Sequence, residues 1–404
     1  MELKPGYKET EIGIIPVDWD VDCVENIGHV TTGSKNTQDR IEDGDYPFFV
    51  RSQTVERINT YSFEGEAVLT AGDGVGTGKV FHYINGKFDV HQRVYRISDF
   101  SPRVNGYFFY LYFSRNFYNR IMQMTAKSSV DSVRRDMITR MMVPLPTIEG
   151  EQDAISQAIR DADCLLDGLD RLIAKKRDLK QAAMQQLLNG ETRLPGFTGE
   201  WKEKRLGELG VFLKGSGVKK DDSQSGPLPC VRYGEIYTHH NEYIKNYYSF
   251  ISPDVAGTAQ ALKQGDILFA GSGETREEIG KCTAFIDDCE AYAGGDIVIF
   301  RSQGLNPLFL GFCLNMPSVN RQKASKGQGD AVVHISAAAL SSIVVNLPPE
   351  VEEQTAIATV LSDMDTEIAT LEKRRNKTKD IKQAMMQELL TGKTRLVTPG
   401  GSNA

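Results

Sequence analysis

Apolar residues recur at helical spacing in two long stretches of this chain, residues 151–194 and 353–396. In the first stretch the apolar positions step by four, three, four, three and four: Ile155, Ile159, Ala162, Leu166, Leu169 and Ile173. The second stretch keeps the same steps: Ile357, Leu361, Met364, Ile368 and Leu371. This heptad pattern is typical of a helix that packs along its length against another helix. Each stretch lacks proline up to a closing glycine, Gly190 or Gly392, which suits a left-handed C-cap.

The two stretches are copies of one another. At a constant offset of 202 (353 − 151) they match without a gap at 20 of 44 positions, where chance gives roughly two or three. A helix of about 37 residues is roughly 55 Å long, too long to be buried in one globular core. Each apolar seam therefore needs a partner helix, and we expect that partner to be the other copy.

The heptad pattern is interrupted in the middle of each copy. Arg374 and Arg375 stand where the first copy has Leu172 and Ile173. We interpret the interruption as a stutter. After it, the seam is expected to continue through a shifted set of residues: Leu179, Ala183 and Leu187 in the first copy, Ile381, Met385 and Leu389 in the second.

The segments between the helices are duplicated more loosely. Each has a lead-in to a tryptophan, Trp19 or Trp201, and ends in a proline-containing strand just before its long helix. Short β-branched and aromatic runs predict strands, while residues 106–124 and 307–316 look helical, so each segment is expected to be an α+β domain. The predicted organisation is a first globular domain, a spacer helix, a second globular domain, and a second long helix with a tail: residues 1–150, 151–194, 195–350 and 351–404.

The order of the repeated pieces is cyclic. The first helix copy continues from Leu194 into the lead-in to Trp201, whereas the second ends near Leu396 and the N-terminus supplies the lead-in to Trp19. We therefore expect the two ends of the chain to meet in space.

Composition indicates a soluble, cytoplasmic protein. No run of 18 apolar residues exists, and residues 1–19 lack the apolar core of a secretion signal. The six cysteines form no C-x-x-C pair, so we predict reduced thiols and no metal site. The net charge of −7 argues against a nonspecific nucleic-acid binder, and any DNA contact must come from local patches.

Motifs for catalysis or cofactor binding are missing. The glycine-rich run from Gly72 to Lys79 departs from a phosphate-binding loop at Asp73 and Val80, and its glycines alternate instead of following the dinucleotide pattern. A tight turn is the expected role, with close approach to a ligand backbone as the alternative. Residues 346–349 lack the adjacency and the aromatic residue of the Asn-Pro-Pro-aromatic motif of adenine methyltransferases.

Basic and polar side chains suited to nucleic acid gather near the end of each globular segment. Such side chains can bond phosphates and base edges, although a solvated charged face is an equally good interpretation. The candidates there are Lys127, Ser129, Arg134 and Arg135 in the first segment and, at the place taken to correspond, Lys323, Lys326 and Gln328 in the second. Weaker candidates close a predicted strand in each segment: Arg51, Gln53, Arg232 and Tyr233.

Two duplicated α+β domains, each followed by a helix that ends in Leu-Leu-x-Gly-x-Thr-Arg-Leu, resemble the DNA-specificity subunits of Type I restriction-modification enzymes. The resemblance covers the whole chain and rests on the order of several short motifs. They are residues 12–19, Leu145-Pro146 with Glu151-Gln152, Leu347-Pro348-Pro349 with Glu353-Gln354, and both Lys-Gln-Ala-x-Met-Gln helices.

The resemblance implies two target-recognition domains that each read one half of a bipartite sequence in double-stranded DNA. An antiparallel coiled coil would hold them apart, set the spacing and dock two DNA adenine methyltransferase subunits; two restriction-translocase subunits can join. The chain itself would have no active site and bind no cofactor, with S-adenosylmethionine, ATP and Mg²⁺ on the partners. The alternatives are a non-catalytic coiled-coil scaffold that reads no DNA, and a methyltransferase with its own recognition domain, which the missing motifs disfavour.

Overall fold

The computed structural model describes residues 5–124, 132–329 and 331–397. The chain divides into two compact units, and each contains a globular part and pieces of both long helices. Unit 1 comprises residues 1–170 and 373–404, and unit 2 comprises residues 171–372. Helix α4 (Glu151–Leu188) therefore begins in unit 1 and ends in unit 2, whereas α11 (Val351–Leu389) begins in unit 2 and ends in unit 1.

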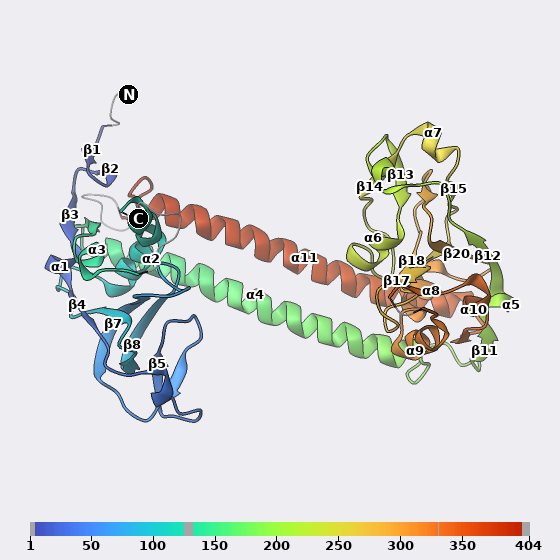
Figure 1. Ribbon diagram of the computed structural model, residues 1–404, viewed down its shortest axis with the longest axis horizontal. Coiled ribbons are helices and arrows are strands. Elements are labelled where there is room, and N and C mark those ends of the chain that lie inside the picture. Colours follow the sequence, from blue (N-terminus) through green and yellow to red (C-terminus); the bar gives the residue numbers. More distant parts are fainter. Residues whose placement is uncertain (1–4, 125–131, 330, 398–404) are drawn as a thin grey trace. The chain divides into compact units, whose positions relative to one another are not determined.

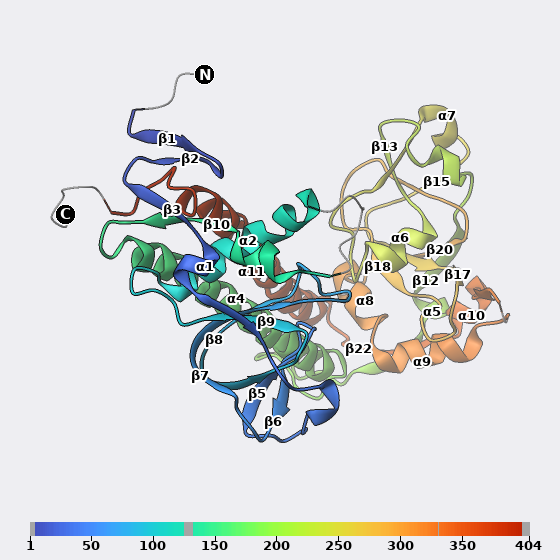
Figure 2. The same ribbon diagram turned by 60° about the vertical axis from the view of Figure 1, so that its left-hand side comes forward.

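Unit 1 is built on a six-stranded sheet in the order β4-β9-β7-β8-β5-β6 (Figure 2). All neighbours are antiparallel except β5 and β8, which run parallel. The sheet strands are β4 (His29–Thr32), β5 (Tyr46–Phe49), β6 (Glu56–Ile58), β7 (Phe63–Ala71), β8 (Phe81–Val90) and β9 (Val94–Ser98). The other elements are β1 (Tyr7–Thr10), β2 (Gly13–Pro16), β3 (Trp19–Cys23), β10 (Met142–Pro146), α1 (Val24–Ile27), the 3-10 helix η1 (Thr37–Asp39), α2 (Gly106–Gln123) and α3 (Arg135–Thr139).

An aromatic face of α2 forms the centre of the unit 1 core. Phe109, Phe113 and Phe117 are fully buried and stack at helical spacing, with ring centroids 5.4 and 4.5 Å apart. The helix begins at Asn105, whose side chain accepts a hydrogen bond from the Phe108 amide. Burial of these rings contributes to the hydrophobic stabilisation of the unit.

Unit 2 resembles unit 1 in the elements at its two ends, but its central strands form two sheets instead of one. One sheet has the order β12-β20-β16-β18 and the other β14-β13-β19-β15, with small pairs β11-β22 and β17-β21. Figure 1 labels strands of both sheets, among them β12, β18 and β20 of the first and β13, β14 and β15 of the second. Its strands are β11 (Lys202–Arg205), β12 (Gly210–Lys214), β13 (Leu228–Val231), β14 (Ser249–Ile251), β15 (Gln260–Ala261), β16 (Asp266–Ala270), β17 (Ser272–Gly273), β18 (Cys282–Ala284), β19 (Tyr292–Ala293), β20 (Ile297–Ser302), β21 (Val333–His334) and β22 (Val344–Leu347). Its helices are α5 (Leu206–Leu209), the 3-10 helix η2 (Lys220–Ser223), α6 (Tyr233–Thr238), α7 (Pro253–Ala256), α8 (Pro307–Cys313), α9 (Pro317–Lys326) and α10 (Ala337–Ser341).

The two long helices run antiparallel within each unit. In unit 1, Asp163 accepts from Lys382 and Asp170 from Arg375, so one residue number rises as the other falls. In unit 2, the Nζ atoms of Lys176 and Lys180 lie 2.6 and 2.7 Å from carboxylate oxygens of Glu367 and Asp365, respectively. The predicted α+β fold with tandem repeated domains and an antiparallel helix pair is confirmed.

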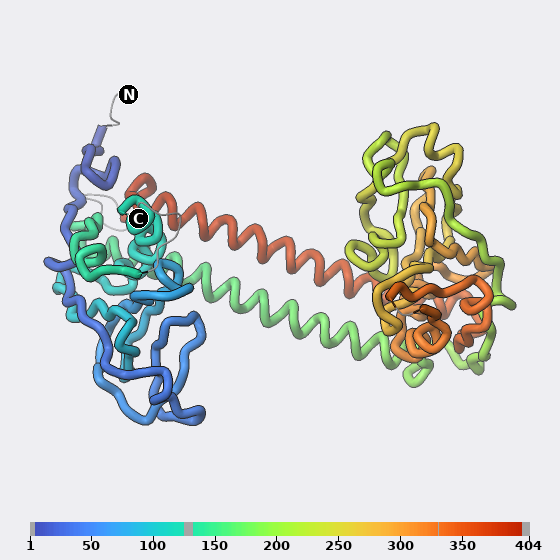
Figure 3. The backbone as a smooth tube through the Cα atoms, in the orientation of Figure 1, coloured from blue at the N-terminus to red at the C-terminus, as the bar shows by residue number. Residues whose placement is uncertain are grey.

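The segments at the two ends of the described chain also meet, as predicted. Figure 3 shows the end of α11 returning to the N-terminal strands of unit 1. There Arg395 bonds Asp18, and the Tyr7 hydroxyl donates to the Gly392 carbonyl at 3.1 Å.

Candidate nucleic-acid interface

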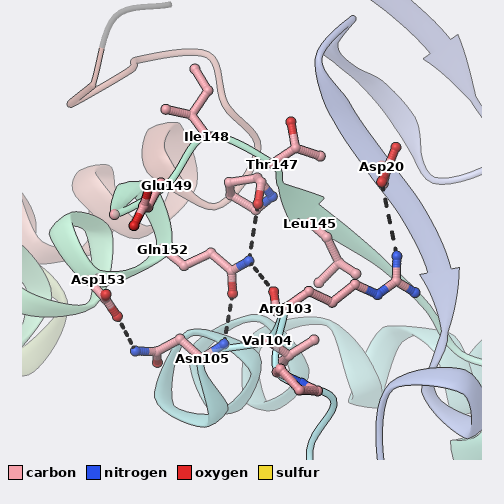
Figure 4. Close-up of a pocket in the computed structure, with 13 residues that line it drawn as sticks. Asp20, Arg103, Val104, Asn105, Leu145, Thr147, Ile148, Glu149, Gln152 and Asp153 are labelled. Carbon is pink, nitrogen blue, oxygen red and sulfur yellow. Dashed lines mark hydrogen bonds and ion pairs between the residues drawn. The ribbon is translucent and has the colours of Figure 1, made fainter.

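In each unit, a glutamine near the start of a long helix bonds that helix to the globular part that precedes it. In unit 1 the Gln152 amide donates to the carbonyls of Pro146 (3.1 Å) and Arg103 (2.9 Å), and its oxygen accepts from the Asn105 amide at 2.9 Å. These bonds lie beside a groove of about 590 Å³ between the end of β10 and the start of α4 (Figure 4). Gln354 repeats the pattern in unit 2, where it accepts from Asn306 at 3.0 Å and donates to Pro348 at 3.3 Å.

The glycine-rich loop after β7 approaches two arginine backbones. A Cβ atom on Gly72 would lie 2.9 Å from the Arg93 carbonyl oxygen, and one on Gly76 would lie 2.5 Å from that of Arg51. Gly74 and Gly78 have positive φ values of 80° and 67°, which side chains rarely tolerate. The loop is therefore a tight turn, as expected, and its tip presents Val75, which is 98 % exposed.

Arg51 lies at this loop. Its guanidinium Nη1 lies 2.9 Å from Asp73 Oδ1, and Arg93 Nη1 contacts the other carboxylate oxygen. Gln53, two residues further on, is exposed. Asp73 and Arg93 are not among the candidate residues named from the sequence. The signal for Asp73 was present, because it breaks the phosphate-loop pattern, whereas Arg93 stands in a turn between strands without any motif.

Arg134 and Arg135 start α3 and are both exposed. The segment before them runs along the glycine-rich loop, because Ser132 forms a β-bridge with Asp73 and the Val133 amide donates to the Gly72 carbonyl at 2.7 Å. The structure therefore brings Arg51 and the 134–135 segment to one side of unit 1. Lys127 and Ser129, the other candidates here, lie outside the described residues.

The Lys323 prediction is wrong. This lysine is 1 % exposed, and its Nζ donates to the carbonyls of Gly280 (2.7 Å) and Leu314 (2.9 Å). Burial lowers the pKa of its ammonium group. The side chain ties α9 to the loop before β18 and cannot reach DNA in this fold.

The correspondence assumed between the two polar segments is also wrong. α3 directly precedes β10, and its positional counterpart in unit 2 is α10, which precedes β22. Lys323 and Lys326 belong to the earlier helix α9, where Lys326 is half-buried. Gln328 is exposed and exchanges backbone hydrogen bonds of 2.9 and 2.7 Å with His334.

The remaining candidates of unit 2 lie at the start of α6. Arg232 is the half-buried N-cap residue, and its backbone amide donates to Glu235 at 3.1 Å. Tyr233, the first residue of the helix, is exposed.

The backbone hydrogen bonds identify equivalent positions in the two units. Gly72 N to Arg93 O (2.8 Å) corresponds to Gly271 N to Asp296 O (2.7 Å). Two more pairs agree: His91 N to Phe49 O (3.0 Å) with Gly294 N to Val231 O (2.9 Å), and Val133 N to Gly72 O (2.7 Å) with Ile335 N to Gly271 O (2.9 Å). In this alignment four equivalent positions carry different types of side chain in the two units. Arg51 aligns with Tyr233, Asp73 with Ser272, Arg93 with Asp296, and Ser132 with His334.

The predicted seam residues fall into three environments. Some pack into the globular cores at the helix ends: Ile155 and Ile159 in unit 1, Ile357 and Leu361 in unit 2. Nearer the helix middles the burial is more varied: Leu169, Ile173 and Ile368 are buried, while Leu166, Met364 and Leu371 are half-buried. The stutter prediction fails at Leu179 and Ile381, which are 46 % and 49 % exposed. Next to these two residues, α4 and α11 contact each other through ion pairs such as Lys180–Asp365 and Lys382–Asp163.

Residues 5–124, 132–329 and 331–397 contain neither a metal-binding cluster nor a membrane-spanning helix. No group of three or more His, Cys, Asp or Glu side chains there is arranged to hold a metal ion. None of the helices in this part of the chain has an apolar stretch long enough to cross a lipid bilayer.

Comparison with known proteins gives a consistent result. The family model of the Type I restriction modification DNA specificity domain matches twice, at residues 16–175 and 198–380. The EcoDI specificity subunit of Escherichia coli is 27 % identical over 198 residues, which cover 48 % of this chain and 41 % of that protein. The MjaVIII specificity subunit of Methanocaldococcus jannaschii is 21 % identical over 97 % of this chain and 96 % of its own.

Solved structures share the fold. The S subunit of the Type I restriction-modification system of M. genitalium has a TM-score of 0.62 at 14 % identity, covering 96 % of this chain and 98 % of that one. A chain from a study of complex assembly and conformational transition of the Type I system has a TM-score of 0.55, also at 14 % identity, and covers 94 % of this chain and 99 % of its own. With its duplicated match to the family model, this chain belongs to the Type I restriction-modification DNA specificity family.

Proposed function

We propose that this chain reads a bipartite target in double-stranded DNA, with one globular part for each half-site. The observation that supports this most directly is the pair of equivalent surfaces that differ in side chain. Equivalent backbone hydrogen bonds lie at or next to Arg51, Asp73 and Arg93 in unit 1 and Tyr233, Ser272 and Asp296 in unit 2, where Ser272 is buried and the other two are exposed. One frame with two sets of donors and acceptors is suited to recognising two different base sequences.

The helix pair is proposed to set the half-site spacing and to dock two adenine methyltransferase subunits. Support comes from exposed apolar residues on α4: Leu172 and Leu179 lie seven positions apart on one face in unit 2, and Leu165 is similarly exposed in unit 1. Exposed apolar residues repeated along a helix mark a surface that a partner covers. The partners would bind S-adenosylmethionine and carry out methylation, and restriction-translocase subunits with ATP and Mg²⁺ can join them.

A domain exchange tests the proposal. Residues 20–145 would be replaced by those of a related specificity subunit with a different target, and the complex with its adenine methyltransferase would be reconstituted. Sequencing of methylated sites should then show one altered half-site and one unchanged half-site. A change in both half-sites would contradict the assignment of one reader to each unit. Methylation without any sequence preference by the unaltered complex would favour the scaffold alternative.

A further inference from the structure

Two arginines of unit 1 converge on one carboxylate. Arg51 follows β5, Arg93 lies in the turn between β8 and β9, and Asp73 lies in the glycine-rich loop after β7. Each guanidinium contacts Asp73 through Nη1, Arg51 at one carboxylate oxygen and Arg93 at the other. Three separate elements therefore meet at this point, and Asp73 links them.

The backbone around the cluster is closely fitted. Gly72 and Gly76 allow the loop to touch the backbones of both arginines, and the Arg93 amide donates to Nδ1 of the buried His91 at 3.0 Å. Partial burial raises the pKa of Asp73, but hydrogen bonds and charge from Arg51 and Arg93 outweigh that effect and lower it. The carboxylate is therefore ionised at neutral pH and holds both guanidinium groups in place.

The outward donors of the two arginines are available. Their side chains are 44 % (Arg51) and 61 % (Arg93) exposed, and among the described residues each guanidinium bonds only to Asp73. Nε and Nη2 of Arg93 can therefore donate to a ligand as a planar pair. A guanine presents O6 and N7 in the matching geometry in the major groove. The exposed Val75 at the loop tip shows that this loop projects from the surface, as groove entry requires.

We propose that Arg93 reads a guanine in the half-site of unit 1, with Asp73 as the positioning residue that also holds Arg51 against the DNA. This inference rests on the proposed function and names the base contact within it. In unit 2 the equivalent positions are Tyr233, Ser272 and Asp296, which cannot form an arginine pair around a carboxylate. The second half-site therefore lacks this contact.

The decisive variant is Arg93→Lys in the complex reconstituted with the methyltransferase. Lysine keeps the charge but cannot make the planar two-donor contact. The target and a scrambled duplex would be compared over several salt concentrations, with the target taken from methylation-site sequencing of the unaltered complex. Affinity for the target should fall roughly ten- to hundredfold, and preference for one base pair should be lost. Affinity for the scrambled duplex and the salt slope should stay the same.

Asp73→Asn tests the positioning role. It removes a negative charge, so binding to the scrambled duplex should strengthen while the ratio of target to scrambled affinity falls. A residue that only maintains the fold would weaken both together. Arg40→Lys is the matched control, because Arg40 is an exposed arginine of unit 1 that pairs with Glu56 at 3.5 Å; it should change neither affinity.

The outcomes separate the two proposals. If the unaltered complex shows no sequence preference, the proposed function fails. If that complex is selective and Arg93→Lys keeps the same selectivity at every base pair, Arg93 does not read a base and this inference is overturned.

Discussion

Arg395 donates hydrogen bonds of 2.9 and 2.8 Å to the two carboxylate oxygens of Asp18, although the residues are 377 positions apart. The same guanidinium contacts Glu151, which is fully buried at the start of α4. Arg193, the copy of Arg395, bonds the equally buried Glu353 at the start of α11, with Nη2 2.7 Å from Oε2. The arginine at the end of each repeat thus pairs with a buried glutamate at the start of the other long helix.

Arg395→Ala and Arg193→Ala should each lower the free energy of unfolding by about 3 to 5 kcal/mol. Each substitution leaves a buried carboxylate without its cationic partner, which is the costly way to break such a pair. Urea unfolding of the full chain measures the effect. Arg375→Ala is the control, because Arg375 pairs with Asp170 at an exposed position and its loss should cost less than about 1 kcal/mol. Equal effects at positions 395 and 375 would show that the ion pairs of Arg395 contribute little to the free energy of unfolding.

Acid should destabilise the fold through His240. This imidazole is buried, and desolvation lowers its pKa to about 4 from 6.5, with help from the charges of His239 and Lys281. Between these two pH values the unfolded chain binds a proton that the folded chain does not, so stability falls as pH drops below about 6.5 and the loss ends near 4. The difference in urea midpoint between pH 7.5 and pH 5 should therefore shrink in His240→Gln. An unchanged difference would mean that His240 is not the responsible group.

Repetition made the architecture predictable. The 202-residue offset identified the long helices, their pairing with each other and the meeting of the chain ends, because each copy repeats both the apolar spacing and residues such as the glutamine near the helix start. The antiparallel orientation was expected from the family resemblance. Gln152 and Gln354, for example, stand at equivalent positions and make equivalent bonds to the start of a helix.

The site was less predictable, because side-chain environment depends on contacts that are distant in sequence. Lys323 looks like a surface lysine in a polar run, yet its ammonium group satisfies two carbonyls inside unit 2. Leu179 and Ile381 continue an apolar pattern, but ion pairs occupy the facing side of their turns. Arg93 could be associated with Arg51 only after the sheet register had brought Asp73 between them.

Substitution of two leucines of α4 by aspartate should distinguish residues that pair the helices from residues that bind a partner. Leu169 is 4 % exposed and Leu179 is 46 % exposed. Leu169→Asp buries an unpaired carboxylate, which should destabilise the helix pair by several kcal/mol and prevent assembly. Leu179→Asp should leave the stability of the isolated chain unchanged within about 0.5 kcal/mol while weakening methyltransferase binding.

Circular dichroism melts and calorimetric titration with the methyltransferase measure the two effects. Leu179→Ala is a milder companion variant that should weaken binding less. Normal binding by Leu179→Asp would show that the exposed face of α4 does not dock the methyltransferase.

Charge removal at the start of α3 should affect DNA binding without affecting the fold. Arg134 and Arg135 are exposed, so Arg135→Ala should leave the unfolding midpoint unchanged. If Arg135 contacts a phosphate, the loss of that contact reduces the slope of log affinity against log salt by about one. The expected weakening is equal on target and scrambled duplexes, because phosphate contacts do not depend on sequence.

Lys323→Met is the contrasting variant, because it removes one positive charge from inside unit 2. It leaves the carbonyls of Gly280 and Leu314 without their donor, which should lower stability by about 1 to 3 kcal/mol. The salt slope of the assembled complex should not change.

If Arg135→Ala leaves affinity and slope unchanged on both duplexes in a complex that still assembles, residues 134–135 form a solvated face. DNA contact in unit 1 would then be assigned to the cluster of Arg51, Asp73 and Arg93.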